Sequence, residues 1–67
     1  MTKLEEFVQD RLYRVKHTSD TEFQNVLFHQ AFGAIEFACL LYSDYDIEIS
    51  EWWNDVKRPE FRKNMGG

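Results

Sequence analysis

The stretch from about residue 20 to residue 43 constrains the fold most, because its apolar residues cover nearly the whole circumference of a helix. Two apolar stripes run along it at helical spacing, one beginning at Phe23 and the other at Phe28. A surface helix of an ordinary globular protein has a broad polar side. The polar strip here is narrow and consists of Glu22, Asn25, His29, Glu36 and Ser43. This helix is therefore predicted to be surrounded by other elements over most of its length.

The chain offers little material to surround such a helix. Its 67 residues give room for one domain and a thin core, and domains of this size often add a disulfide, a metal site or a partner chain. Cys39 is the only cysteine, so no disulfide can form within the chain and a cytoplasmic location is expected. The amino-terminal segment lacks the continuous apolar stretch of an export signal, and polar residues interrupt the central helix, so no membrane association is predicted.

Capping patterns indicate where the first two helices begin. Thr2 and Glu5 have the spacing of a capping box, and the apolar residues after them recur at helical intervals, which predicts a helix over about 3–16. Ser19 and Glu22 repeat this spacing and predict the start of the central helix. At about 1.5 Å per residue, the first helix can cover little more than half the length of the central one.

Small residues in the central helix would allow another helix to approach closely. Gly33 lies in the middle of the helix, where glycine costs about 1 kcal/mol relative to alanine. Either another segment of the chain crosses at this position or two copies of the chain pair there. Because the chain is short of covering material, the prediction is a helix-packed homodimer. The expected self-association residues are Phe28, Ala31, Phe32, Gly33, Ala34, Ile35 and Ala38.

The periodicity changes after the central helix. Over 44–50, polar residues alternate with tyrosine or isoleucine, a period-two pattern typical of a strand. A lone strand is unstable, so the sequence predicts an extended connection whose Ile47 and Ile49 close the end of the bundle, with strand pairing between two chains as an alternative. A short third helix is expected over about 51–58, ending before the proline, and a final turn over about 59–64. The predicted fold is a single all-α domain of three helices, with a long central helix and a short aromatic carboxyl-terminal segment.

Charge is distributed unevenly along the chain, whose net charge is −4. No lysine or arginine lies between Lys16 and Lys57. The acidic residues in this gap are Asp20, Glu22, Glu36, Asp44, Asp46, Glu48, Glu51 and Asp55. These charges either balance the basic ends within the fold or form a charged binding surface.

Candidate catalytic and metal-binding residues form no recognised pattern. The acidic segment before the third helix has oxygen-bearing residues spaced as in an EF-hand calcium loop, but Ile49 stands where glycine is required and Asp55 where a longer glutamate is usual. His17, His29 and Cys39 match no zinc-binding spacing. The sequence therefore predicts a protein that is not an enzyme and that uses no metal or cofactor.

Two adjacent tryptophans point to a binding surface. The side chains of Trp52 and Trp53 point in directions about 100° apart around a helix, so both can be buried only where that helix lies between two surfaces. Tryptophan is frequent among interface anchors, and neighbouring acidic residues would orient a basic partner. The predicted function is a protein-binding or regulatory accessory module; the alternative is that both tryptophans fill the core. The predicted partner-binding residues are Tyr45, Asp46, Glu48, Glu51, Trp52 and Asp55.

Two functions that involve nucleic acids are further alternatives. The acidic surface could imitate a nucleic acid and inhibit a DNA- or RNA-binding enzyme, although −4 is a low charge for a mimic. Basic residues near the carboxyl terminus could instead bind a nucleic acid directly, although the chain as a whole is acidic. These residues are Lys57, Arg58, Arg62 and Lys63.

Overall fold

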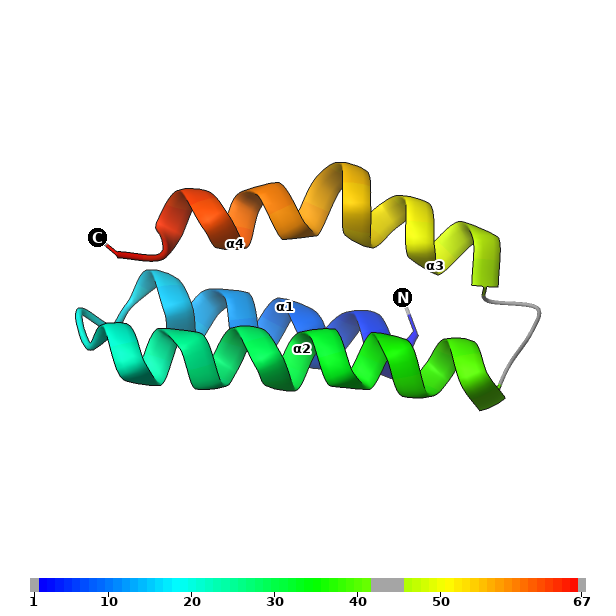
Figure 1. The fold of residues 1–67 in the computed structure, drawn as a ribbon, viewed down its shortest axis with the longest axis horizontal. Helices are drawn as coiled ribbons and strands as arrows, with labels where there is room; N and C mark the ends of the chain where they lie inside the picture. The colour runs from blue at the N-terminus through cyan, green and yellow to red at the C-terminus, as the bar shows by residue number, and fades with distance from the viewer. Residues whose placement is uncertain (1, 42–45, 67) are drawn as a thin grey trace.

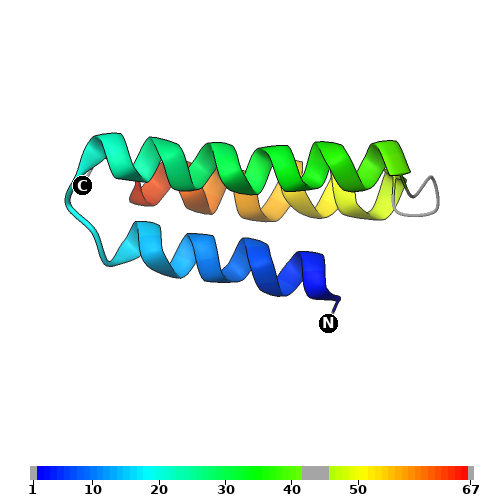
Figure 2. The ribbon, with the colours of Figure 1, turned by 90° about the horizontal axis from the view of Figure 1, so that it is seen from below.

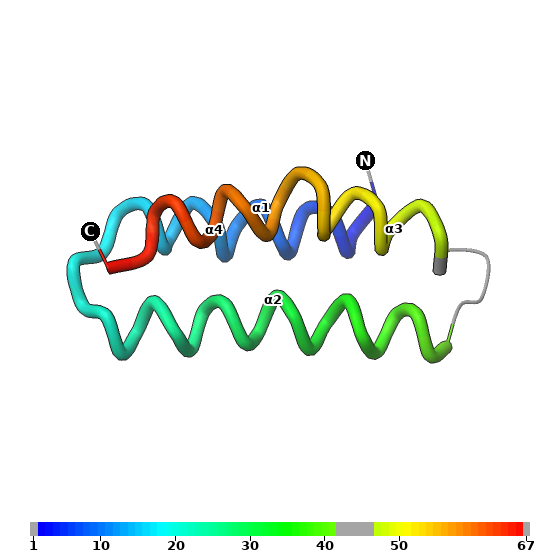
Figure 3. The backbone as a smooth tube through the Cα atoms, turned by 45° about the horizontal axis from the view of Figure 1, so that its top comes forward, coloured from blue at the N-terminus to red at the C-terminus, as the bar shows by residue number. Residues whose placement is uncertain are grey.

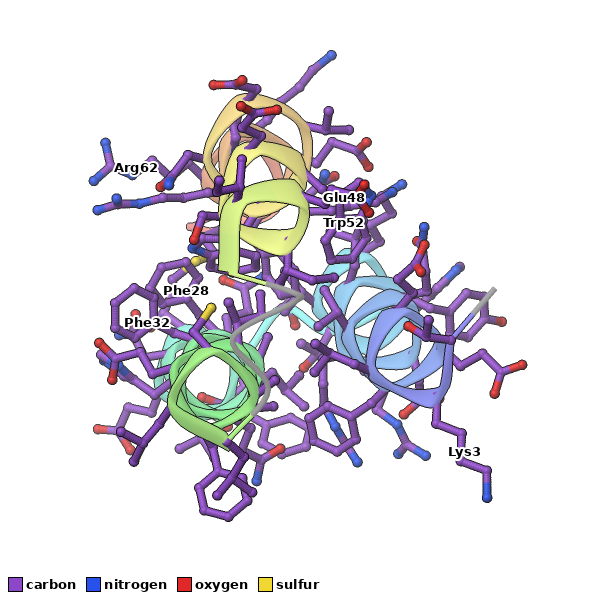
Figure 4. All side chains as sticks on the ribbon, turned by 90° about the vertical axis from the view of Figure 1, so that its right-hand side faces the viewer. Lys3, Phe28, Phe32, Glu48, Trp52 and Arg62 are labelled. Atoms are coloured by element: carbon purple, nitrogen blue, oxygen red, sulfur yellow. The ribbon has the colours of Figure 1, made fainter. Side chains whose placement is uncertain are left out.

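The computed structural model describes residues 2–41 and 46–66, which form three helical rods that run back and forth along one axis (Figure 1). Viewed along that axis, the rods stand at the corners of a triangle (Figure 4). Their bounds are α1 Lys3–Lys16, α2 Thr21–Leu41 and a third rod made of α3 Asp46–Trp52, η2 Trp53–Lys57 and α4 Arg58–Asn64. The bundle measures 36 × 18 × 18 Å. The described residues contain no strand, and the predicted all-α class is confirmed.

The start of α1 is held by the reciprocal bonds of a capping box. The backbone N–H of Glu5 donates to Thr2 Oγ1 at 3.2 Å, and the Thr2 backbone N–H donates to Glu5 Oε1 at 3.3 Å. These bonds satisfy two amide groups that have no partner in the first turn of a helix. From there, Val8, Leu12 and Val15 follow at steps of four and three residues and form the buried side of α1.

The start of α2 is capped by Asp20 and not by Ser19, so the predicted second capping box is wrong. Asp20 Oδ1 accepts the backbone N–H groups of Glu22 at 3.0 Å and Phe23 at 3.2 Å. Serine and aspartate are comparable caps, and here the aspartate carboxylate, one residue further along, makes the bonds. The predicted end of this helix, near residue 43, lies outside the described residues.

The third rod covers the part of α2 that α1 does not. It lies alongside α2 in both side views (Figure 2 and Figure 3). Between the three rods, α2 buries one line of side chains: Gln24, Leu27, Ala31, Ile35 and Ala38. The carboxyl-terminal segment is therefore long enough to act as the third wall of the bundle.

The connection predicted to be extended over 44–50 is helical from Asp46 onward. The prediction was wrong for 46–50, and residues 44 and 45 lie outside the described part of the chain. Ile49 is buried as expected, whereas Ile47 is 72% exposed and closes nothing. Ile49 packs in the core together with Trp53, one helical turn later. A helix places both residues on its buried side, and this packing outweighs the strand-like alternation of the sequence.

The third rod also continues through Pro59, where the third helix was predicted to end. The backbone N–H of Arg58 donates to the carbonyl of Trp53, five residues earlier, so the turn is wider than an α-helical turn. In an α-helix the proline ring would collide with the carbonyl four residues before it. A wider turn directly before the proline relieves this collision, which explains why the rod does not break.

The wide turn also keeps one face of the rod directed at the core. Ile49, Trp53, Lys57 and Phe61 are all buried, although they are spaced at steps of four residues. In an α-helix each such step overshoots a full turn by about 40°, or about 120° over all three steps. A turn that holds more residues offsets this drift. Phe61 therefore returns to the core.

An aromatic cluster joins the third rod to α2. The ring of Trp53 lies 5.7 Å from that of Phe28, 6.1 Å from that of Phe32 and 5.5 Å from that of Phe61. Tilted and edge-to-face rings at these distances attract one another beyond the effect of area burial. The aromatic residues of the chain thus cover part of the second apolar stripe of α2.

A buried glutamine ties the ends of all three rods together. Gln24 Nε2 donates toward the carbonyls of Val15 at 3.3 Å, Thr18 at 2.9 Å and Asn64 at 3.2 Å, and Gln24 Oε1 accepts the Gly66 N–H at 2.7 Å. Carbonyls at helix ends have no partner within the helix. The amide of Gln24 supplies donors to them and fixes the carboxyl-terminal end beside the turn between α1 and α2.

Candidate partner-binding surface

Three of the predicted partner-binding residues form one stripe on the third rod. Glu48, Glu51 and Asp55 are all exposed and follow each other at steps of three and four residues. Residues at this spacing lie on one side of a helix. We call these three residues the acidic stripe. Among the described residues, none of the three is within ion-pair distance of a cation, since the four ion pairs involve only Asp10 and Glu60 as acids.

Trp52 lies beside the acidic stripe and is half-buried. Its ring packs against the hydrophobic core, and the Lys57 ammonium lies 5.8 Å from the ring centroid. Figure 4 shows Trp52 and Glu48 on the same side of the third rod, the side toward α1. The adjacent Trp53 is buried in the aromatic cluster. Of the two tryptophans, one therefore belongs to the core and the other reaches the surface next to three carboxylates.

The remaining predicted partner-binding residues lie at the edge of the described part of the chain. Tyr45 falls outside it. Asp46 is the first residue of α3, and its side chain is among the atoms not described. The structure therefore brings together four of the six predicted residues and leaves the other two unplaced.

Lys57, which the sequence grouped with the basic residues of the carboxyl terminus, is buried. It is only 7% exposed, and its Nζ lies 3.4 Å from Glu60 Oε1. Glu60 Oε2 lies 3.9 Å from the Nζ of Lys16 on α1. The predicted basic cluster thus loses one of its four cations to an internal ion pair. The signal for this burial was the four-residue spacing from Trp53 to Lys57 to Phe61.

Glu60→Gln is expected to lower the free energy of unfolding by about 1 kcal/mol, because it leaves the Lys57 ammonium buried without a counter-charge. The loss is smaller than for a fully buried pair, since the Glu60 side chain is partly exposed. Lys57→Met removes the charge together with its burial cost, and should change stability by less than about 0.5 kcal/mol or raise it. Urea denaturation measures both, with Glu51→Gln as an exposed control. Equal losses for the two substitutions at the pair would contradict this account.

The predicted self-association residues of α2 are divided between core and surface. Ala31, Ile35 and Ala38 are buried within the chain, and Phe28 and Phe32 pack against its core. The first three are covered by the chain's own helices, whereas Phe28 and Phe32 stay partly exposed, as does Ala34. Gly33 is exposed. Four of the seven predicted residues therefore reach the surface at least in part.

A shallow groove runs between α2 and the third rod. Its lining includes Phe32, Cys39, Ser50, Trp53 and Arg58. The Cys39 thiol lies 3.8 Å from the Ser50 hydroxyl, and this pair has no histidine or carboxylate among its recorded hydrogen-bond partners. The indole N–H of Trp53 and the Nε of Arg58 are buried with no hydrogen-bond partner in the described part of the chain. Glu36 also lines this groove, together with Cys39 and Arg58.

No group of three or more histidine, cysteine, aspartate or glutamate residues within 2–41 and 46–66 is placed to hold a metal ion. Over the same residues, no helix has the length and apolar character needed to cross a membrane.

Comparison with known proteins reveals no relative of this chain. No protein-family model matches it, and neither a curated protein sequence nor a solved structure is significantly similar to it. The geometry of its surfaces is therefore the basis for a functional proposal.

Proposed function

We propose that this chain is a non-catalytic binding module that holds a basic protein partner through the acidic stripe and Trp52. The observation that carries the proposal is the exposure of three carboxylates on one side of one rod, without a cation paired to them among the described residues. Charges that the fold does not neutralise attract a complementary surface and orient it during approach.

Trp52 supplies the apolar part of the proposed contact. Its ring is already held by core packing and by the Lys57 ammonium, so little side-chain freedom is left to lose on binding. A tryptophan that is partly exposed and held in place is the type of residue that often dominates the binding energy of an interface. The acidic stripe would then determine which partner approaches, and Trp52 would hold it.

The test is affinity capture from a lysate of the source organism, with retained proteins identified by mass spectrometry. Wild-type protein and the Glu6→Lys control should retain the same basic protein, because Glu6 is an exposed acid that belongs to α1 and not to the third rod. Glu51→Lys makes the same charge change within the stripe and should weaken binding by at least about tenfold. Trp52→Ala should abolish retention and keep most of the helical circular-dichroism signal.

Three outcomes would contradict the proposal or redirect it. Equal effects of Glu51→Lys and Glu6→Lys would show that the acidic stripe is not the binding surface. Collapse of the helical signal in Trp52→Ala would assign Trp52 to the core, and Trp52→Phe would then be compared in its place. Retention of a nucleic-acid-binding enzyme that duplex DNA displaces would favour a nucleic-acid mimic.

A further inference from the structure

The side of α2 that faces away from the core carries a line of mostly apolar residues at alternating steps of three and four. We call this line the outer α2 stripe: Phe23, Val26, Gln30, Gly33, Phe37 and Leu40. Leu40 is 81% exposed and Phe37 is 62% exposed, and the two other large apolar residues of the stripe are exposed as well. This spacing is typical of a helix seam that packs against a second helix.

Gly33, in the middle of the outer α2 stripe, has no role within the chain's own packing. A Cβ built on Gly33 would meet nothing within 4 Å, and the residue has no left-handed backbone angle that would require glycine. Glycine is among the least favourable residues inside a helix. A glycine at this position is explained if another backbone approaches α2 there.

The edge of this face that borders α1 is positively charged. Lys16 on α1 reaches Glu60 on α4, so that edge of α1 lies against the third rod. The side chains of Arg11 and Arg14 project from the opposite side of α1, across the buried line from Lys16, and this side faces α2. They share a single counter-ion, Asp10, at 3.7 Å and 3.0 Å. Two guanidinium groups with one carboxylate leave this edge basic.

The opposite edge of the same face is acidic. It is formed by the narrow polar strip of α2, which contains Glu22, His29 and Glu36 and no lysine or arginine of its own. Arg58 of the third rod lines the same groove as Glu36, so the acidic character of this edge rests mainly on Glu22. Glu22 in the first turn of α2 and Arg14 in the last turn of α1 lie at the same end of the bundle, because a short turn joins the two helices. The face therefore has an apolar centre, a basic edge and an acidic edge.

We propose that a second copy of this chain docks on the outer α2 stripe, with the two α2 helices parallel and closest at Gly33. A two-fold axis parallel to α2 places the basic edge of each copy opposite the acidic edge of the other. An axis perpendicular to α2 would place like charges together. In the parallel arrangement each Gln30 meets its counterpart, and a polar pair inside an apolar seam fixes the register of two helices.

The size of the face sets the size of the proposed dimer contact. One long side of the bundle measures 36 by 18 Å, about 650 Å² in projection, so a contact over this side lies toward the small end of the range for specific interfaces. The ring of Phe7 extends the apolar centre onto α1, where the Arg11 guanidinium covers it at 4.5 Å.

This second-copy interface is independent of the proposed partner-binding surface. The third rod stands at the corner of the triangle opposite the α1 and α2 face (Figure 4). The acidic stripe of each copy therefore stays accessible in the dimer, and failure of either proposal leaves the other standing.

Sedimentation equilibrium over a concentration series tests the dimer. The wild-type mass should rise from 8.1 kDa to twice that value with concentration. Leu40→Lys should raise the dissociation constant at least tenfold without loss of helical signal, because Leu40 is 81% exposed in its own chain. Ile47→Lys is the matched control, since Ile47 is similarly exposed but lies on α3, and it should dimerise like the wild type.

Two further sets of variants test the crossing point and the direction of the helices. Gly33→Ala should keep the fold intact and weaken the dimer at least tenfold, because the new methyl group separates the two backbones. Arg14→Glu and Glu22→Arg should each weaken the dimer, and the double variant should restore it. A wild-type protein that stays monomeric at millimolar concentration, or a Leu40→Lys variant that still dimerises normally, would overturn the proposal. Failure of the double variant to restore the dimer would overturn the parallel arrangement.

Discussion

Phe61→Ala is expected to lower the free energy of unfolding by about 3–5 kcal/mol. Phe61 is fully buried, and its ring lies 5.5 Å from that of Trp53 and 5.8 Å from that of Phe28. Removing it leaves a cavity where the third rod meets α2. A domain of this length has a total stability of only a few to about 10 kcal/mol, so a large fraction of the variant should be unfolded at room temperature. Urea denaturation followed by circular dichroism measures the loss.

The control for Phe61→Ala is the same substitution at an exposed phenylalanine. Phe37→Ala should change stability by less than about 0.5 kcal/mol when measured at a concentration where the protein is monomeric. The difference between the two variants separates core packing from the general effect of losing a phenyl group. A loss below about 1 kcal/mol in Phe61→Ala would show that the third rod does not pack on α2 as described.

Gln24→Ala should cost about 2–3 kcal/mol, an unusually large effect for a residue that is polar. The substitution removes the donor to the carbonyls of Thr18 and Asn64 and the acceptor for the Gly66 N–H, and leaves these groups without a partner at the end of the bundle. Buried polar groups that lose their partners carry a desolvation cost. Thermal unfolding gives the change in stability.

Amide hydrogen exchange distinguishes this role of Gln24 from a simple loss of packing volume. The Gly66 N–H should exchange much faster in Gln24→Ala, while amides in the middle of α1 should change only with global stability. Gln30→Ala, measured at a concentration where the protein is monomeric, is the control, because Gln30 is an exposed glutamine on the same helix. Unchanged protection of Gly66 relative to the wild type would contradict the proposed link between Gln24 and the carboxyl-terminal end.

Local signals in the sequence were sufficient for α1 and for the existence of α2. The Thr2 and Glu5 pair forms the expected bonds, because a capping box involves only residues three apart. The start of α2 was less certain, since Ser19 and Asp20 are both good caps and the pattern does not rank them. Such local choices can be predicted only to within one or two residues.

The third rod could not be predicted from local pattern, because its shape depends on what it packs against. Over 46–50 the residues alternate as in a strand, and only the burial of Ile49 beside Trp53 distinguishes a helix. Pro59 is a strong stop signal, yet the wide turn before it allows the rod to continue. Both misreadings underestimated how much of the chain can cover α2.

The candidate surfaces could be predicted only in part, because they too depend on how the helices pack against one another. Trp52 and the three carboxylates were found from residue type, and a helix over about 51–58 was predicted, but its extension back to Asp46, which brings Glu48 onto the same side as Glu51 and Asp55, was not. On α2, apolar residues point in almost every direction, so periodicity alone does not say which side meets the core. The packing of α1 and the third rod against α2 determines which side of α2 is buried, and it leaves Phe37 and Leu40 exposed to solvent.

The path of the chain through the bundle has a consequence for how quickly it folds. Each rod follows directly on the one beside it (Figure 1), so most packing contacts join segments that are near in sequence, and helical bundles of this kind fold in about microseconds to milliseconds. The bonds from Gln24 to Asn64 and Gly66 span 40 and 42 residues. Contacts of such span carry the largest loop-closure entropy. We therefore expect the hairpin of α1 and α2 to assemble first and the carboxyl-terminal end to lock last.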